Sequence, residues 1–204
     1  MVSRKRNFDF ILIPAFCLIL ASASCPAFAQ KRGWETIESL VQLFGVWAGD
    51  EPDRQIYDEA ANFIDYEMMG QRAIGESQWS KLTPAQRKDF VQTFRKLIEE
   101  RYYPRWHKIF RSGKLEYLNT VNASGDTLVR TELKLGDDED DLIWRLNPRS
   151  GDLKIISLSV DNKDLLQHVA ARFQRKLKKC DFTQFMKWLR DELDDDDDDN
   201  KAPS

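Results

Sequence analysis

The sequence predicts an α+β fold in which several helices come first, an antiparallel sheet follows, and two further helices close the domain. Apolar residues recur at helical spacing between residues 34 and 103, and again between residues 165 and 193. Between residues 115 and 160 they alternate with polar residues, and clusters of turn-forming residues divide this region into four segments. Separate blocks of helices and strands are typical of α+β domains, in which we expect helices to cover one face of the sheet.

The first 29 residues have the features of a secretory signal peptide. Three basic residues at positions 4–6 precede an apolar run over residues 10–23, and the ending "AFA" favours cleavage after Ala29. The run contains Pro14 and is shorter than the roughly 20 apolar residues that a membrane-spanning helix needs. We therefore expect residues 1–29 to be removed on export, so that the mature chain begins at Gln30.

Composition limits what the mature chain can be. Only Cys180 of the three cysteines follows the predicted cleavage site, which excludes a disulfide within the mature chain. The whole sequence has 31 basic and 34 acidic residues. Residues 1–29 contain three basic residues and one acidic residue, and residues 194–204 contain one basic and six acidic residues. The domain between these two segments therefore has 27 basic and 27 acidic residues. This balance gives no overall bias toward nucleic acid, although a local basic run lies between Arg172 and Lys179.

We expect residues 30–193 to form one domain and residues 194–204 to form an acidic, solvated tail. The tail begins with six consecutive aspartates. Metal binding or docking to a partner remains an alternative role for it, but carboxylates that repel each other do not form a fixed metal site without a turn.

Three helices are predicted before residue 80. The second follows the turn-forming Asp50-Glu51-Pro52, and the third begins near Asp65, whose side chain suits a helix cap. The third ends at Gly75, because glycine commonly terminates a helix. The apolar positions of these helices are Trp34, Ile37, Leu40, Val41 and Phe44, then Ile56, Ala60 and Phe63, then Met68, Met69 and Ile74.

The segment "LTPAQRKDFVQTFRKLIEERYY" carries its own helix start signal. Thr83 suits the cap, Pro84 the first helical position, and Gln86 the capping-box partner. The charged residues, Glu99 among them, fall on the face opposite an apolar stripe, and we expect the helix to end before Pro104. Such a stripe fits an ordinary core as well as the wall of an apolar cavity. It is formed by Phe90, Phe94, Leu97, Ile98 and Tyr102.

Four strands are predicted over residues 115–122, 127–135, 141–146 and 153–160. In the second, Val129 and Leu133 alternate with charged residues, which gives that strand one wet face. The clusters "NASGD", "GDDED" and "NPRSGD" separate the strands and predict an antiparallel meander. The two closing helices have apolar faces formed by Leu165, Leu166, Val169, Phe173 and Leu177, and by Phe182, Phe185, Met186, Leu189 and Leu193.

The segment "NFIDYEMMGQRAIGESQWSKLTPAQRKDFVQTFRKLIEERY" resembles the signature region of the periplasmic phospholipid carriers of the lipid-asymmetry pathway, the MlaC or toluene-tolerance family. Downstream, "DLIWRLNPRSGDLKIISLSVDNKDLLQHVAARFQRKL" is similar to the paired strands and helix of that family. The resemblance covers most of the mature chain. Its matching features are Asp65, Gly75 with Trp79 four residues later, Gln86-Arg87, Phe90, Phe94, Leu97 and Tyr102.

The resemblance implies a cone like that of the nuclear transport factors, with a curved four-stranded sheet packed on N- and C-terminal helices around an apolar cavity. Physical chemistry supports enclosure, because about 30 methylenes at about 0.8 kcal/mol each would cost on the order of 24 kcal/mol to hold in water. Each lining residue fits an ordinary core equally well. The expected lining residues are Met68, Met69, Phe90, Phe94, Leu97, Ile98, Tyr102, Val129, Leu133, Trp144, Ile156, Leu158, Val169 and Phe173.

The resemblance also implies partners and a compartment. A periplasmic carrier of this family would shuttle a phospholipid between an outer-membrane lipoprotein complex and an inner-membrane ABC transporter with an MCE-type subunit. No cofactor, metal or nucleic acid is expected. Another lipid, such as a hopanoid, is an alternative ligand.

An enzyme is the competing hypothesis, because a cone of this kind also houses catalysts that place an aspartate and a tyrosine in an apolar pocket. The candidates are Asp65, Tyr66, Tyr102 and Tyr103, although a helix cap explains Asp65 more simply. His107 and His168 are far apart and outside any metal-ligand spacing. Cys180 lies among lysines without a partnered base, and a protein-binding module with a filled core is a third alternative.

Overall fold

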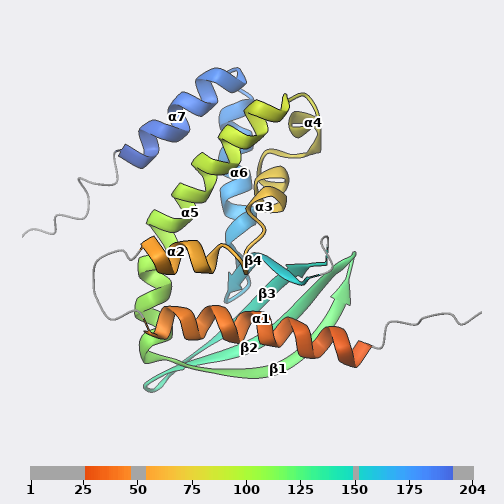
Figure 1. Cartoon of the computed structure of the whole chain (residues 1–204), viewed down its shortest axis with the longest axis vertical. Helices are drawn as coiled ribbons and strands as arrows, with labels where there is room; N and C mark the ends of the chain where they lie inside the picture. Colours follow the sequence, from red (N-terminus) through yellow and green to blue (C-terminus); the bar gives the residue numbers. More distant parts are fainter. Residues whose placement is uncertain (1–25, 47–53, 149–151, 195–204) are drawn as a thin grey trace, which may run out of the picture.

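The chain has the α+β fold that the sequence predicts, in a computed structural model that describes residues 26–46, 54–148 and 152–194 (Figure 1). Most of the predicted signal segment and all but the first residue of the acidic tail lie outside the described residues, and the predicted cleavage site at Ala29 falls within the first helix. The helices are α1 (Pro26–Val46), α2 (Arg54–Ala60), α3 (Tyr66–Ile74), α4 (Glu76–Trp79), α5 (Pro84–Ser112), α6 (Leu165–Leu177) and α7 (Phe182–Asp194).

Five antiparallel strands form one sheet in sequential order, so the prediction of four strands is wrong by one. The additional strand, β5, has two residues and pairs with the end of β4. Asp161 and Asn162 form the turn between them with φ of 49° and 64°, and a type I′ hairpin needs positive φ at both central residues. The strands are β1 (Lys114–Ala123), β2 (Asp126–Leu135), β3 (Asp138–Asn147), β4 (Lys154–Val160) and β5 (Lys163–Asp164).

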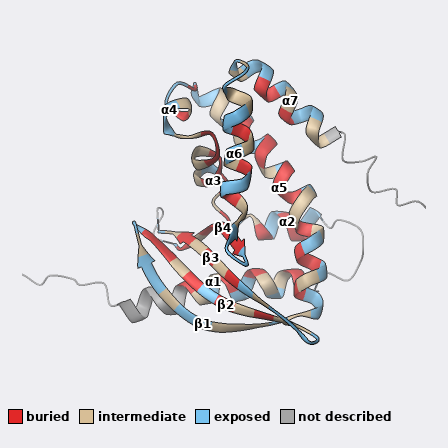
Figure 2. Cartoon of the chain, turned by 180° about the vertical axis from the view of Figure 1, so that it is seen from behind, coloured by how far each residue is buried: buried red, intermediate tan, exposed pale blue. Residues whose placement is uncertain are grey.

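The sheet is buried differently along its width (Figure 2). In β2 the alternation is as predicted, with Val129 and Leu133 buried and Arg130 exposed. In β4 both faces are buried, because α6 packs against this strand. Ser157 and Ser159 donate hydrogen bonds to the Asp164 carboxylate at the start of α6, at 2.8 and 3.4 Å. Helices thus cover one face of the sheet at β2, as predicted, whereas β4 is buried on both faces.

The long helix α5 connects the two parts of the molecule. Figure 1 shows its N-terminal half among α3, α6 and α7, and its C-terminal half beside the sheet, across which α1 lies. Phe110 of α5 stacks on Trp144 of β3 with ring centroids 5.8 Å apart. At the other end, Phe90 has ring contacts with Phe173 of α6 and Phe185 of α7. One helix therefore fixes the position of the sheet relative to the upper helices.

The prediction that this helix ends before Pro104 is wrong, because α5 continues through the proline to Ser112. An internal proline costs about 3 kcal/mol, since a hydrogen bond is lost and the ring meets the preceding turn. The continuation, however, buries Trp106, His107 and Phe110. Burial of one large apolar side chain contributes about 1.5–3 kcal/mol, so two such residues outweigh the cost of the proline.

The predicted helix ends are confirmed where a side chain or a glycine specifies them. Asp65 caps α3 by accepting a hydrogen bond from the Met68 N–H at 2.9 Å, and Gly75 ends it with φ of 84°. Thr83 and Gln86 form the capping box of α5. In contrast, α2 ends at Ala60, before Phe63, and the four-residue α4 has no counterpart in the prediction.

We predict that Gly70→Ala destabilises the protein by about 1–3 kcal/mol, the usual cost of overpacking a core. A Cβ at Gly70 would lie 2.9 Å from Cε1 of Phe90, whose fully buried ring has no space to move into. Gly45→Ala in α1 is the control, because a Cβ there meets nothing within 4 Å. Chemical denaturation should show lower stability for the first variant alone; equal stability of both would contradict the packing described.

Candidate functional site

The fourteen residues that the sequence predicts as a cavity lining belong to one connected apolar core. Met68 and Tyr102 are partly buried and pack on that core, and the other twelve are buried. These twelve are Met69, Phe90, Phe94, Leu97, Ile98, Val129, Leu133, Trp144, Ile156, Leu158, Val169 and Phe173. The structure therefore brings the predicted residues together, while their role in holding a ligand stays a prediction.

On the helical side, this core is an aromatic cluster. Phe90 and Phe94 of α5 stack with centroids 5.9 Å apart, and both contact Phe173 of α6 at 6.3 and 5.9 Å. Phe173 also contacts Phe185 of α7 at 5.3 Å. The ring contacts of Phe94 are thus with α5 and α6.

On the sheet side, two glycines allow the backbone to approach closely. A Cβ at Gly33 of α1 would lie 3.1 Å from Val129, and one at Gly113, which follows α5, would lie 2.6 Å from Leu133. Trp144 is fully buried, and its indole N–H donates to the Thr131 hydroxyl at 3.0 Å. The sheet side therefore forms an apolar floor of the core, and the indole N–H of Trp144 has a hydrogen-bond acceptor there.

Besides Trp144, five of the predicted lining residues have no exposed surface in the described part of the chain. The zero exposure of Phe90, Phe94, Ile98, Val129 and Ile156 means that no water-sized space touches them from outside or from within. Three surface pockets of about 590, 380 and 370 Å³ lie elsewhere, and none of the fourteen predicted residues lines them. A ligand could enter this core only if side chains and the elements that carry them moved apart.

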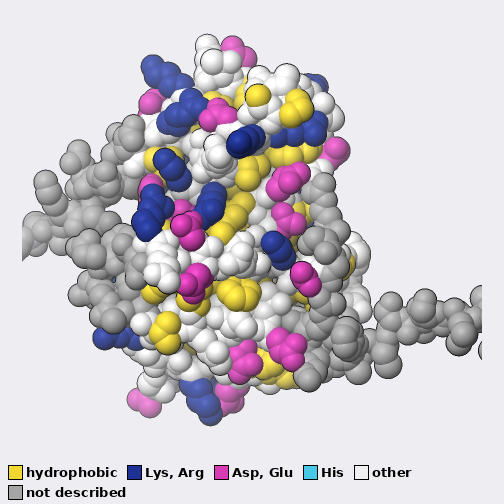
Figure 3. Space-filling model, in the orientation of Figure 1, with side chains coloured by type: hydrophobic (Ala, Val, Ile, Leu, Met, Phe, Trp, Pro, Cys, Tyr) yellow, Lys and Arg dark blue, Asp and Glu magenta, His cyan; other side chains and the backbone are white. Residues whose placement is uncertain are grey.

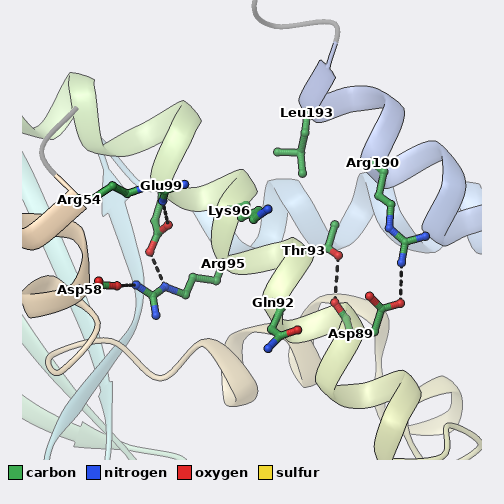
Figure 4. Close-up of a pocket in the computed structure, with 10 residues that line it drawn as sticks. All are labelled: Arg54, Asp58, Asp89, Gln92, Thr93, Arg95, Lys96, Glu99, Arg190 and Leu193. Carbon is green, nitrogen blue, oxygen red and sulfur yellow. Dashed lines mark hydrogen bonds and ion pairs between the residues drawn. The ribbon is translucent and has the colours of Figure 1, made fainter. Parts of the chain in front are cut away.

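The largest of the three pockets is a polar groove over α5, with α2 on one side and α7 on the other (Figure 4). Glu99 lies against it with only 2 % of its side chain exposed, paired with Arg54 at 3.2 Å and with Arg95. Arg95 also pairs with Asp58 at 2.6 Å and lies over the Tyr66 ring at 5.8 Å. The prediction that Glu99 faces solvent is wrong, because Arg54 and Asp58 of α2 lie over this side of α5.

A second charged cluster, which sequence reasoning missed, joins the upper helices to the sheet. The buried Asp126 carboxylate accepts two hydrogen bonds from Arg72 of α3, at 2.7 and 2.8 Å. Arg145 and Asn147 of β3 donate to the same carboxylate at 3.3 and 2.8 Å. In the sequence Asp126 is simply one polar residue of a turn, so no local pattern marks it.

The chain before α3 makes another connection at the same boundary. The Asp65 N–H donates to the Ile155 carbonyl at 3.0 Å, and the Ile155 N–H donates to the Phe63 carbonyl at 2.8 Å. Together with the Asp126 cluster, these backbone bonds attach α3 to β2, β3 and β4. The α3 side of the core is therefore held by polar bonds.

The residues considered for catalysis are not arranged as an acid–base pair. Asp65 caps α3, while the hydroxyls of Tyr66 and Tyr103 contact each other inside the core. Burial raises the pKa of both tyrosines, so both stay protonated at neutral pH. Burial also raises the pKa of Tyr102, which lies at the edge of the core.

The histidines and the cysteine do not form a metal site. His107 is buried with Nδ1 2.8 Å from the Phe44 carbonyl oxygen, whereas His168 is exposed. Cys180 is half-buried, with its sulfur 3.3 Å from the Lys176 carbonyl. Over the described ranges, no group of three histidine, cysteine or acidic side chains is placed to hold a metal ion. Nor is any helix of these ranges long and apolar enough to cross a membrane.

A sequence model of the MlaC protein family matches residues 49–191, more than half of the chain. The chain belongs to the MlaC family. The matched range begins before α2 and ends within α7, so it contains all fourteen predicted core residues as well as Glu99 and Asp126. The resemblance drawn from the signature segment is therefore confirmed.

Among solved structures, the fold of this MlaC-family chain is similar to that of a phospholipid-binding protein from Ralstonia solanacearum, determined in complex with a phospholipid. The TM-score is 0.66 at 18% sequence identity, and the match covers 81% of this chain and 98% of the other. At this identity the likeness shows a common fold. No curated protein matches the chain.

We predict that Asp126→Asn lowers the stability at neutral pH by about 3 kcal/mol, because breaking a buried ion pair leaves the arginines without their partner. The difference from the unchanged protein should shrink as the solution becomes acidic. Burial opposes ionisation of Asp126, but Arg72, Asn147 and Arg145 outweigh it and lower the pKa of this carboxyl below its usual value. A lowered pKa stabilises the fold above the usual carboxyl pKa of about 3.9, and that contribution is lost as pH falls through the lowered pKa.

Thermal unfolding between neutral and strongly acidic pH measures this difference. Asp137→Asn, in an exposed turn, is the control and should change stability by no more than about 0.5 kcal/mol. A stability difference for Asp126→Asn that stays constant from neutral to strongly acidic pH would contradict the assignment.

Proposed function

We propose that this protein is a periplasmic carrier that encloses the acyl chains of a phospholipid between its sheet and its helices. The observation that carries the proposal is the single apolar core spanning both layers in a chain of the MlaC family. Its fold is that of a protein solved with a phospholipid bound, which is the second support. A binding protein also fits better than an enzyme, because Asp65 and the paired tyrosines are used structurally.

The charges of the molecule are arranged as this function requires. Acyl chains need an apolar environment. The buried tryptophan and phenylalanine side chains between the sheet and the helices provide one, because they are large, apolar and uncharged. On the outer face shown in Figure 3, basic and acidic side chains are interspersed. Such a mixed surface keeps a carrier in solution and does not favour nucleic acid.

Uptake of a lipid then requires the core to open. Because the predicted lining residues are packed against one another, the acyl chains would take the place of ring contacts such as Phe94 with Phe173. The exchange is energetically feasible, since one apolar surround replaces another and the net transfer free energy is small. Opening would produce the cavity of a cone-shaped fold like that of the nuclear transport factors, lined by the residues predicted from the sequence.

The remaining parts of the proposal concern processing and partners. Residues 1–29 would direct export and be removed after Ala29, which leaves residues 30–193 as the carrier domain. The lipid would pass between an outer-membrane lipoprotein complex and an inner-membrane ABC transporter with an MCE-type subunit. The chain itself would need neither cofactor nor energy source for this exchange.

Organic extraction of the purified protein, followed by mass spectrometry, tests the proposal. We expect a two-chained phospholipid at a stoichiometry near one per protein. A co-purified polycyclic lipid would retain the carrier function and change its ligand. Protein that is free of lipid after gentle purification, and that vesicles cannot load, would argue against a carrier.

A pair of variants separates binding from folding. Leu133→Lys introduces a charge into the apolar floor, whereas Val121→Lys places the same charge on β1, where the valine is 50% exposed. Lipid content should fall in the first variant and stay unchanged in the second, with circular dichroism reporting the fold of each. Leu133→Gln makes the same comparison if the lysine variant unfolds, and full lipid content in a folded Leu133 variant would contradict the binding mode.

A further inference from the structure

Three helices meet at one carboxylate, that of Glu192 in the last turn of α7. Arg101 of α5 donates from one guanidinium nitrogen to the Glu192 carbonyl at 3.1 Å and to its carboxylate at 3.3 Å. Arg172 of α6 forms an ion pair with the same carboxylate oxygen. Two guanidinium groups from different helices therefore converge on one negative charge.

The surroundings hold these guanidinium groups in place. The side chains of Arg101 and Arg172 are 25% and 37% exposed, so each is largely withdrawn from solvent. Arg172 and Lys176 both lie over the Trp188 ring, at 5.2 and 5.3 Å from its centroid. No ion pair joins Lys176 to a carboxylate within the described ranges. Positive charge is thus concentrated and partly desolvated here, which strengthens its attraction for an anion.

The charged cluster adjoins the apolar core. The Trp188 ring contacts Phe173 with centroids 6.0 Å apart, and Phe173 contacts Phe94 at 5.9 Å. On α5, Tyr102 follows Arg101 and packs on the core from its edge. Burial raises the pKa of the Tyr102 hydroxyl, and the positive charges of the neighbouring arginines oppose this rise. The cluster therefore lies next to residues that are predicted to contact acyl chains.

A carboxylate and a phosphodiester present the same pattern to arginine. Each has two oxygens that share a negative charge, and the planar fork of a guanidinium group donates to either. In a phospholipid, the phosphodiester is joined to the glycerol from which the acyl chains extend. A phosphodiester in the place of the Glu192 carboxylate would therefore direct the acyl chains toward Phe173 and Phe94.

We propose that Arg101 and Arg172 form a binding site for the phosphodiester of the lipid head group, and that the Glu192 carboxylate occupies this site in the free protein. The inference rests on the proposed carrier function and adds a site for the head group. An incoming phosphodiester displaces the carboxylate, so the last turn of α7 loses its polar contacts with α5 and α6. Because α7 also packs on the core through Phe185 and Leu189, binding of the head group promotes the opening of the core.

Competition between two lipids tests the site. Lipid-free protein is loaded from phosphatidylglycerol vesicles that contain a small fraction of diacylglycerol, and mass spectrometry compares the ratio bound with the ratio offered. We expect the unchanged protein to prefer phosphatidylglycerol. Arg101→Gln with Arg172→Gln should lower this preference several-fold and still take up diacylglycerol. Arg111→Gln with Arg175→Gln is the control with equal net charge and should keep the preference, because both arginines are exposed on the same two helices.

Glu192→Gln tests the occupancy by the carboxylate. Removal of the charge should raise the rate of lipid loading several-fold, because the phosphodiester no longer competes with a carboxylate for Arg101 and Arg172. Asp89→Asn is the control, since Asp89 pairs with Arg190 at 2.6 Å and so also connects α5 to α7, but outside the site. An equal gain in both variants would mean that a loosened α7 speeds loading, and would overturn the proposal.

The lipid competition separates this site from the carrier function. If the unchanged protein takes up both lipids in the ratio offered, the head-group site is overturned and the carrier function stands. Uptake of neither lipid would overturn both. Inorganic phosphate that binds the lipid-free protein through these arginines, but does not slow the loading of phosphatidylglycerol, would assign the site to a free anion and overturn the head-group assignment.

Circular dichroism reports the fold of each variant. A folded glutamine double variant that keeps the lipid preference would contradict the site. If that variant unfolds, Arg101→Lys with Arg172→Lys takes its place, because lysine keeps the charge and removes the bidentate fork. A smaller loss of preference is then expected, and an unchanged preference would overturn the proposal.

Discussion

The contact of one long helix with both parts of the molecule is the constraint on which the rest of the structure depends. Through Phe90 and Phe94, α5 contacts α6 and α7, and through Phe110 it reaches the sheet. Because Phe90, Phe94 and Trp144 have no exposed surface, the helical and sheet sides form one continuous core. Any ligand of the interior must therefore be accommodated by moving these layers, and the fold concentrates its apolar surface where acyl chains would need it.

Polar groups define the boundary of this core. Asp126 joins α3 to β2 and β3, and the backbone bonds of Ile155 join the start of α3 to β4. Glu99 with Arg54 and Arg95 joins α5 to α2. A buried charge that is fully paired adds little to stability, but its loss is costly, so such clusters keep one arrangement of the layers while the apolar contacts between them can exchange partners.

The sequence carries most of the local structure and little of the arrangement in space. Caps such as Thr83 and alternation such as that around Val129 depend on neighbouring residues, so they were predictable. Pro104 led to a wrong prediction of the helix end, because the helix continues and buries Phe110 against Trp144, which is distant in the sequence. Asp126 and Glu99 were missed for the same reason, since their partners Arg72 and Arg54 lie about 50 residues away in the chain. The apolar lining was predictable as a set, because hydrophobic periodicity marks it, but periodicity does not tell whether the space is filled.

The most direct test of an interior lipid site is photolabelling with a phospholipid that carries a diazirine near the end of one acyl chain. After loading from vesicles and irradiation, peptide mass spectrometry locates the adducts. An enclosed acyl chain predicts adducts on both layers, at residues such as Phe94 and Phe173 of the helices and Val129 and Ile156 of the sheet. Adducts confined to the outer surface, for instance around Trp79 and Val91 in the second pocket, would contradict an interior site.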